Sequence, residues 1–312
     1  FGIETSFVDS ERPEAFAAAI RPNTRAIYAE TLGNPSLVML DIAAVADVAH
    51  AHGLPLVVDN TVPSPYLCNP CAHGADIVVH SATKYLAGHG TSLAGVVVES
   101  GRKHGAFAWD NGKFPGMTEP SPGYHGVRFY ETFGDFAFTM RARLETLRVF
   151  GPALSPMNAW LVLQGIETLH VRMREHVRNA RRVADFLRAH PKVAWVHYPG
   201  HPDSPQYARC ARYLKPIEGE PGASSLLAFG IRAEDPLAAG IRFIESLQFI
   251  SHVANIGDTR TLVIHPASTT HRQLDPEQQR AAGVTPDLIR MSIGIEAIED
   301  ILWDIERALE VA

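Results

Sequence analysis

Two stretches of sequence decide the fold: Leu-Pro-Leu-Val-Val-Asp-Asn-Thr at residues 54–61 and Ala-Asp-Ile-Val-Val-His-Ser-Ala-Thr-Lys-Tyr at residues 75–85. Each opens with a short apolar run that has the length and the valine content of an interior strand, so we predict strands at Leu54–Val58 and Ala75–Val79. Each run then gives way to polar residues. Near-continuous apolar strands are typical of a parallel sheet, in which ligands bind beyond the carboxyl ends of the strands.

The neighbouring segments continue this pattern. Arg25–Thr31 predicts a strand that stops at the turn signal Gly33-Asn-Pro35. Asp41–His52 predicts a helix that is capped by its aspartate and has one apolar face. Ala94–Glu99 predicts a fourth strand. Strand–helix–strand alternation of this kind indicates an α/β fold with a mostly parallel sheet that is covered on both faces.

The second half of the chain has a different character. Trp109–Gly126 is rich in Gly and Pro and has no periodicity, so we predict a long surface loop there. Gly and Pro between residues 151 and 156 mark a break, which divides the chain into a large domain, residues 1–155, and a smaller α+β domain, residues 156–312. A long helix interrupted near Gly165 opens the second domain. Its other predicted elements are the strands Val193–His197, Ser225–Phe229 and Thr261–Ile264 and a final helix at Ala297–Leu309.

The composition is that of an ordinary globular protein, with 312 residues, 46% of them hydrophobic and 20% charged, and a formal net charge of −6. Because the chain has neither a long basic run nor a long apolar run, we expect neither nucleic acid nor a membrane as a partner. The three cysteines, Cys68, Cys71 and Cys210, are too few for a disulfide framework, and no second pair completes a zinc site. We therefore expect a cytoplasmic protein and no metal ion.

Polar side chains follow the predicted strands and are expected to converge on one rim of the sheet. Asn34 follows the first strand, Asp59 the second, and Ser81, Thr83 and Lys84 the third. Pyridoxal phosphate (PLP) requires a lysine amine for its aldehyde, an acid that keeps its pyridine nitrogen protonated, and donors for its phosphate. Lys84, Asp59 and the two hydroxyl groups match those requirements, so the residues themselves predict a PLP site.

The same residues have other interpretations. Taken singly, a lysine beyond a strand is more often solvated, and an aspartate there often caps a helix or pairs with a base. Ser81-Ala-Thr-Lys84 also matches S-x-x-K, in which Ser81 would be a nucleophile and Lys84 its base. That motif requires a later Ser-Asp-Asn and Lys-Thr-Gly, and neither tripeptide occurs in the chain. Just beyond the lysine, Gly88-His-Gly90 would let the backbone pass close to a ligand.

Longer motifs carry a resemblance to a known family. Val57-Val-Asp-Asn-Thr61 followed by His80-Ser-Ala-Thr-Lys-Tyr85 resembles the signature of the Cys/Met-metabolism PLP-dependent enzymes. The similarity extends over nearly the whole chain and includes Gln164-Gly-Ile-Glu-Thr-Leu169, His265-Pro-Ala-Ser268 and Arg290-Met-Ser-Ile-Gly294. It implies a PLP-dependent transferase of the aspartate aminotransferase-like fold, fold type I.

The resemblance also implies a role for each matching residue. Arg290 matches the arginine that grips the α-carboxylate of the substrate, a task that suits the planar guanidinium fork. Without the family match, a structural ion pair would be the preferred interpretation of Arg290. The cofactor contacts implied are Lys84 as the Schiff-base lysine, Asp59 at the pyridine nitrogen, Ser81 and Thr83 at the phosphate, and Asn34 near the phenolic oxygen.

Within the family, three stretches resemble the O-acetylhomoserine sulfhydrylase branch: Thr31–Pro35, the loop from Asn111 to Gly126, and Ser251–Asp258. Lyases of the family tend to have serine where Asn255 falls, so Asn255 is a second candidate substrate contact. The branch implies a γ-replacement that converts O-acetylhomoserine and sulfide to homocysteine and acetate, a trans-sulfuration step of methionine biosynthesis. Cystathionine γ-synthase and methionine or cystathionine γ-lyase activities remain alternatives.

The start of the chain raises a further alternative. The sequence begins at Phe1 without Met and in strand-like residues, and we expect an upstream segment. In the family, that segment holds a glycine-containing phosphate loop, the aromatic residue that stacks on PLP, and a Tyr and an Arg donated to the neighbouring subunit. The resemblance implies a homotetramer built from dimers that share active sites. Without such a segment, a non-catalytic fragment or assembly subunit is the alternative.

Overall fold

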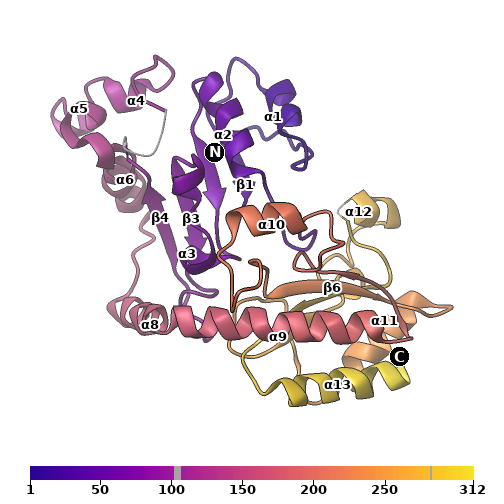
Figure 1. The fold of residues 1–312 in the computed structure, drawn as a ribbon. Helices are drawn as coiled ribbons and strands as arrows, with labels where there is room; N and C mark the ends of the chain where they lie inside the picture. Colours follow the sequence, from indigo (N-terminus) through magenta and orange to yellow (C-terminus); the bar gives the residue numbers. More distant parts are fainter. Residues whose placement is uncertain (102–106, 282) are drawn as a thin grey trace.

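The computed structural model describes residues 1–101, 107–281 and 283–312. The strands form two sheets, and Figure 1 shows the first among the indigo and purple elements and the second among the orange and yellow ones. The strands are β1 (Ile27–Glu30), β2 (Leu56–Asp59), β3 (Ile77–Ser81), β4 (Gly95–Glu99), β5 (Val193–His197), β6 (Leu226–Ile231), β7 (Ser251–His252), β8 (Leu262–Ile264) and β9 (Leu288–Ser292).

The first sheet has the order β1-β2-β3-β4 and is mostly parallel, as predicted. β1, β2 and β3 run in the same direction, and the register pairs Glu30 with Asp59 and Asp59 with Val79. The carboxyl ends of these strands therefore lie at one edge. The fourth predicted strand exists as β4, but it runs antiparallel to β3. The structure agrees with the α/β fold class.

Apolar side chains cover this sheet on both faces. Leu56, Val58 and Val78 belong to the main hydrophobic core, to which the buried face of α2 also contributes. Val57 and Val79 point to the other face, where they pack against a smaller cluster from residues 107–138. Each fully buried side chain of this size stabilises the fold by about 1.5–3 kcal/mol. Because apolar side chains cover both faces of the sheet, the polar residues at the ends of β2 and β3 lie at its edge.

Side-chain caps begin α2, α8 and α11, where Asp41, Ser155 and Asp235 accept hydrogen bonds from backbone amides. The Asp41 carboxylate caps α2 by accepting a hydrogen bond from Ala44 N–H at 3.3 Å, as predicted. Within the described residues, no helix has the length and apolarity needed to cross a membrane. The α-helices are α1 (Pro13–Ala19), α2 (Ile42–Ala51), α3 (Ser64–Leu67), α4 (Pro115–Thr118), α5 (Phe129–Phe133), α6 (Ala137–Arg141), α7 (Arg148–Phe150), α8 (Pro156–Glu167), α9 (Leu169–Ala189), α10 (Tyr207–Tyr213), α11 (Pro236–Ser246), α12 (Pro276–Ala281) and α13 (Ile298–Val311).

Shorter helical turns fill the connections. The predicted loop at Trp109–Gly126 contains α4 and one 3₁₀ turn, and the chain from Phe129 to Phe150 forms short helical pieces, one of them a π-helix. These turns are η1 (Pro70–His73), η2 (Pro122–Tyr124), η3 (Gly134–Phe136), the π-helix η4 (Ala142–Leu147) and η5 (Pro266–Ser268). The predicted long helix is divided at Thr168 into α8 and α9, just after Gly165.

The second sheet has the order β5-β6-β9-β8-β7, with β9 at its centre. In Figure 1, α9 runs along the lower part of the molecule with α13 beneath it. α9 packs against α3 of the N-terminal half as well as against β5, β6 and α13. It therefore connects the two halves physically.

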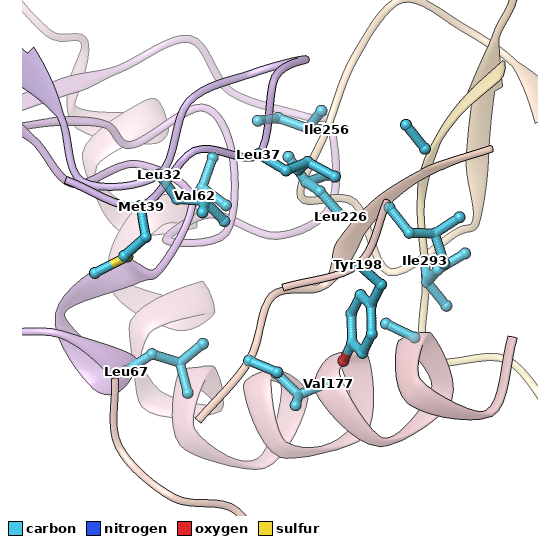
Figure 2. Packing of buried hydrophobic residues seen from close by; sticks show 14 of the residues in the cluster. Leu32, Leu37, Met39, Val62, Leu67, Val177, Tyr198, Leu226, Ile256 and Ile293 are labelled. Carbon is cyan, nitrogen blue, oxygen red and sulfur yellow. The ribbon is translucent and has the colours of Figure 1, made fainter. Parts of the chain in front are cut away.

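Residues of both halves share one hydrophobic core. Figure 2 shows Val62 and Leu67 from the N-terminal half and Val177 and Ile293 from the C-terminal half in this cluster. The predicted boundary between residues 155 and 156 stays a prediction, since the core continues across it.

Candidate active site

The site is built on the edge where β2 and β3 end. Asp59 is the last residue of β2, and Ser81 is the last residue of β3. Lys84 follows in a turn, with its backbone N–H bonded to the Ser81 carbonyl at 3.1 Å. The rim expected from the sequence therefore exists, and it presents a carboxylate, a hydroxyl and an amine on neighbouring strands.

The Lys84 amine is half-buried and reaches across to the second half of the chain. Its Nζ donates a hydrogen bond to the Asn255 side-chain oxygen. Burial, together with the positive charge of Arg290, lowers the Lys84 pKa from the ordinary lysine value of 10.5. Both effects disfavour the ammonium form, so Lys84 is more easily converted to the neutral amine that a nucleophile or a base requires.

Arg290 lies on β9 in the centre of the second sheet and is only 4% exposed. Its Nη1 donates to the Asn34 side-chain oxygen at 3.4 Å and its Nη2 donates to the Asn255 carbonyl at 2.9 Å. Burial lowers the Arg290 pKa to about 10, which leaves it charged at neutral pH. Its Nε has no hydrogen-bond partner in the part of the chain that the structure describes. A buried cation with a free donor is suited to an anionic ligand group.

Four of the predicted residues thus form one cluster. Asn255 contacts Lys84 through its side chain and Arg290 through its carbonyl, and Arg290 also contacts Asn34. The Asn34 backbone N–H donates to the Glu30 carboxylate at 3.1 Å, which ties this residue to the end of β1. The structure therefore brings together residues from both sheets that lie far apart in the sequence.

Asp59 is held by two donors and has a neighbour that sequence reasoning missed. Its Oδ1 accepts from Thr61 N–H at 2.9 Å, and its Oδ2 accepts from the Tyr28 hydroxyl at 3.2 Å. Burial, and next the charge of Asp59, raises the Tyr28 pKa to about 12, so Tyr28 stays a donor. A carboxylate has about four acceptor positions, and Asp59 therefore keeps capacity for a protonated ring nitrogen. Strand alternation in Arg25–Thr31 was the signal available for Tyr28.

The two hydroxyl residues differ. The Ser81 amide donates to the Thr61 hydroxyl at 2.8 Å, which fixes the end of β3. The Thr83 hydroxyl donates to the Ala94 carbonyl at 3.2 Å and accepts from the Ala94 N–H at 3.0 Å. Its one proton is therefore used within the chain, so a phosphate contact from Thr83 would require this hydrogen bond to break. The phosphate roles of Ser81 and Thr83 stay predictions.

The glycines beyond Lys84 face protein groups. A Cβ at Gly88 would lie 2.3 Å from Arg172 Nη1, and a Cβ at Gly90 would lie 2.6 Å from Asp258 Oδ2. The expected passage of this backbone close to a ligand stays a prediction, and the protein groups that approach it are the side chains of Arg172 and Asp258. Arg172 is a second residue that sequence reasoning missed.

Tyr85 anchors the lysine from the other side. Its hydroxyl pairs with the Ser225 hydroxyl at 2.5 Å, and its ring packs edge-on against His176 at 5.3 Å. A Cβ at Gly257 would lie 2.7 Å from Tyr85 N, so the chain after Asn255 touches the chain after Lys84. The lysine is therefore mounted on a rigid, buried neighbour.

The remaining candidate chemistry receives no support. Cys68 and Cys210 are buried free thiols whose pKa burial raises to about 12, so they are poor nucleophiles. Cys71 is also free, and burial raises its pKa. Lys84 donates to Asn255. Among the described residues it makes no hydrogen bond with the Ser81 hydroxyl, as an S-x-x-K pair would require. No group of three or more His, Cys, Asp or Glu side chains that could hold a metal ion occurs in the described ranges.

The groups that the structure brings together at this site fit PLP. The aldehyde of PLP needs an amine, and Lys84 supplies one with a lowered pKa. The ring nitrogen needs an acid, and the Asp59 carboxylate has acceptor positions left. A substrate carboxylate needs a cation, and the buried Arg290 has an Nε without a partner among the described residues. The fold and the site together define a PLP-dependent enzyme.

The chain belongs to the family described as Cys/Met metabolism PLP-dependent enzyme, whose sequence profile matches residues 1–310. It is 52% identical over 317 residues to O-acetyl-L-homoserine sulfhydrylase of Leptospira meyeri, an alignment that covers 99% of this chain and 70% of that protein. It is 47% identical to O-acetyl-L-homoserine sulfhydrylase 1 of Thermus thermophilus, over 99% of this chain and 71% of the relative.

Solved structures agree with the fold. A putative O-acetylhomoserine (thiol)-lyase of Campylobacter jejuni superposes with a TM-score of 0.88 at 35% identity, covering 97% of this chain and 70% of that one, and it carries a pyridoxyl-lysine phosphate. Cystathionine γ-lyase of Lactobacillus plantarum, complexed with L-serine, gives a TM-score of 0.77 at 32% identity over 98% of this chain and 69% of that one. The predicted family, fold type and cofactor are confirmed.

Proposed function

We propose that this chain catalyses the replacement of the acetyl group of O-acetylhomoserine by sulfide, which yields homocysteine and acetate. The observation that carries the proposal is the identity of 52% and 47% to two O-acetyl-L-homoserine sulfhydrylases over 99% of the chain. A homocysteine synthase of Schizosaccharomyces pombe is 46% identical, and its name gives the same product. The cluster of Lys84, Asn255 and Arg290 supplies groups suited to such an amino-acid substrate.

Lys84 is proposed to hold the cofactor and to move protons. Because burial and Arg290 lower the Lys84 pKa, its amine would be available as a base with PLP and the substrate bound. The amine would take the proton from the substrate α-carbon and then move a β-proton, acetate would leave from the γ-carbon, and sulfide would bond to that carbon in its place. General acid–base help of this kind accelerates a reaction by about 10²–10⁴-fold.

When bound, PLP supplies an electron-withdrawing ring that stores the negative charge left on the substrate after proton removal. Asp59 is proposed to keep the ring nitrogen protonated. Thr61 N–H and the Tyr28 hydroxyl hold its carboxylate in one orientation, so the carboxylate is oriented before the cofactor arrives.

Arg290 is proposed to bind the α-carboxylate of the substrate. Asn34 and Asn255 fix its guanidinium, and its buried Nε provides a further donor. Burial strengthens the pairing because little water competes with the ligand. Asn255 lies between this arginine and Lys84, so it aligns the α-carbon with the base.

The test supplies the purified chain and PLP with O-acetylhomoserine, with and without sulfide, and identifies the products. Homocysteine that forms only with sulfide supports the proposal, whereas α-ketobutyrate from O-acetylhomoserine alone supports a γ-lyase. Lys84→Ala is expected to abolish turnover while the circular dichroism spectrum is kept. Normal turnover in that variant contradicts the role of Lys84, and a wild-type chain that takes up no PLP favours the non-catalytic alternative.

We also propose that the chain works as a homotetramer in the cytoplasm. The outer face of α8 supports an assembly, because Met157, Trp160, Leu163 and Ile166 are 40–63% exposed on it. The three free cysteines fit a reducing compartment. Light scattering of the purified protein measures the assembly, and Trp160→Glu is expected to lower the oligomeric mass. A monomeric wild-type protein at micromolar concentration contradicts the tetramer.

A further inference from the structure

Arg172 is a buried arginine that the proposed chemistry does not use. It lies in the first turn of α9 and is 4% exposed. Its guanidinium contacts the chain that follows Lys84 in the first half of the protein. It therefore links α9 to the loop that carries the lysine.

Backbone and hydroxyl oxygens take the donors of this guanidinium. Nη1 donates to the Tyr85 carbonyl at 2.8 Å, and Nη2 donates to the Leu86 carbonyl at 3.4 Å. Nη2 also donates to the Gly165 carbonyl at 2.6 Å, and Nε donates to the Thr168 hydroxyl at 3.2 Å. Two consecutive carbonyls directly after Lys84 are thus held by one rigid planar group.

The positive charge of Arg172 has no carboxylate partner among the described residues. Burial lowers its pKa, and among the described residues no carboxylate lies within the 4.0 Å of an ion pair. Burying a cation without a counter-ion is costly, and an apolar side chain of similar volume is often equally stabilising or more so. The guanidinium is instead compensated by the oxygens that it holds, among them the Tyr85 and Leu86 carbonyls of the lysine loop.

The surrounding backbone is shaped to this side chain. A Cβ at Gly88 would lie 2.3 Å from Nη1 and 2.5 Å from the central carbon of the guanidinium. A Cβ at Gly165 of α8 would lie 2.3 Å from the Ala87 carbonyl and 2.4 Å from the Leu86 carbonyl. Helix α8 and Arg172 of α9 thus enclose residues 85–88 without room for further atoms.

We propose that Arg172 is a positioning residue that fixes the backbone of the Lys84 turn and so sets where the lysine amine lies. The turn closes locally, with Gly88 N–H bonded to the Lys84 carbonyl at 2.7 Å, and Arg172 holds its outer side. The inference rests on the proposed function only in that Lys84 must carry the cofactor. Arg172 itself touches neither substrate nor cofactor.

The experiment compares Arg172→Met and Arg172→Lys with the matched variant Arg181→Met. Arg181 lies on the same helix and also binds a backbone carbonyl, that of Pro221 at 2.8 Å, along with Glu220. It does not contact the lysine loop. Three readouts are taken at saturating PLP: the melting temperature, kcat and KM for O-acetylhomoserine, and the fraction of Lys84 that borohydride reduction links to PLP, by peptide mass spectrometry.

For Arg172→Met we expect a kcat loss of about 10²-fold, the loss that a displacement of about 1 Å typically causes, with KM within about threefold because Arg290 is untouched. The borohydride-linked fraction falls in parallel, and Arg172→Lys recovers part of both. Arg181→Met is expected to lose some thermal stability while keeping kcat and the linked fraction.

Guanidinium ion added to Arg172→Ala at non-denaturing concentration is expected to restore part of kcat, because it can occupy the vacated space between the carbonyls. The proposal is overturned if Arg172→Met keeps the kcat and linked fraction of the wild type, or if both arginine variants lose activity in proportion to their melting temperatures. An unlinked Lys84 in the wild-type protein indicates a failure of the proposed function instead. If Arg172→Met does not fold, the Arg172→Lys and guanidinium arms decide.

Discussion

Gly257 is the position at which a single methyl group tests the packing behind the lysine. Its φ is +73°, and a Cβ there would lie 2.7 Å from Tyr85 N and 2.9 Å from the Tyr85 ring. Gly257→Ala therefore meets two separate costs. A left-handed conformation costs an L-residue about 1–2 kcal/mol, and overpacking against a rigid neighbour costs about 1–3 kcal/mol more.

Gly151→Ala isolates the first of these costs. Gly151 has a φ of +70°, and nothing lies within 4 Å of its added Cβ. With a shift of about 2 °C per kcal/mol for a chain of this size, we expect Gly151→Ala to lower the melting temperature by roughly 2–4 °C and Gly257→Ala by roughly 4–10 °C. Both are measured at the same saturating PLP concentration, since bound cofactor shifts the apparent stability.

The two variants should also separate in activity. Relief of the clash must move either Gly257 or Tyr85; Tyr85 is next to Lys84 and Gly257 lies two residues from Asn255, so either movement reaches the Lys84–Asn255 contact. A displacement near 1 Å predicts a kcat loss of about 10²-fold for Gly257→Ala and none for Gly151→Ala. Equal melting shifts in the two variants, or an unchanged kcat in Gly257→Ala, would refute the close approach as the structure gives it.

Three further predictions follow from the electrostatics. Arg290→Gln removes a charge that lowers the Lys84 pKa; the pH midpoint for PLP uptake by the apoenzyme is expected to rise, and a fall contradicts the coupling. Asn255→Ala removes the acceptor for Lys84 Nζ and is expected to lower kcat by at least about tenfold in initial-rate assays, because the base is no longer held in place. Asp304→Asn keeps one acceptor oxygen in place of the two that the Gln248, Phe249 and Ile250 amides share, and it removes the charge that faces Arg307; it should lower the free energy of unfolding by about 2–3 kcal/mol at pH 7.

The pH dependence of that last variant has a definite sign. Burial alone would raise the Asp304 pKa, but the backbone hydrogen bonds and Arg307 lower it below 3.8 overall. A carboxylate with a lowered folded-state pKa stabilises the protein above its unfolded-state pKa, and this contribution disappears as pH falls through the folded-state value. Urea unfolding should therefore show the wild-type advantage at pH 7 and its loss below about pH 4; a constant difference would contradict this account.

The first sheet and its rim could be predicted from the sequence because the signals are local. Leu54–Val58 and Ala75–Val79 are apolar runs of strand length, and β2 and β3 occur there with shifts of one or two residues. Parallel strands share an edge, so Asp59, Ser81 and Lys84 had to lie near one another. The direction of β4 could not be predicted, because the apolar pattern of a strand does not show whether it pairs parallel or antiparallel with its neighbour.

The second sheet's contribution to the site has no such local signal. Arg290 lies on β9, which was not predicted as a strand, and Asn255 lies in the turn after β7. Whether a residue of one sheet meets a residue of the other depends on how the sheets pack, which no short window of sequence encodes. Family resemblance placed these two residues near the substrate, and the structure independently brings them to Lys84.

The helical periodicity of the sequence could have singled out Arg172. The buried face of α9 includes Leu169, Met173, Val177 and Ala180, and Arg172 lies on that same face. A charged residue on the apolar face of an amphipathic helix is a local contradiction, because burying its guanidinium requires oxygens that the helix itself does not provide. Those oxygens come from the loop after Lys84. A buried charge on the apolar face of a helix therefore indicates that the helix binds another segment at that point. In this chain the segment is the loop that carries Lys84.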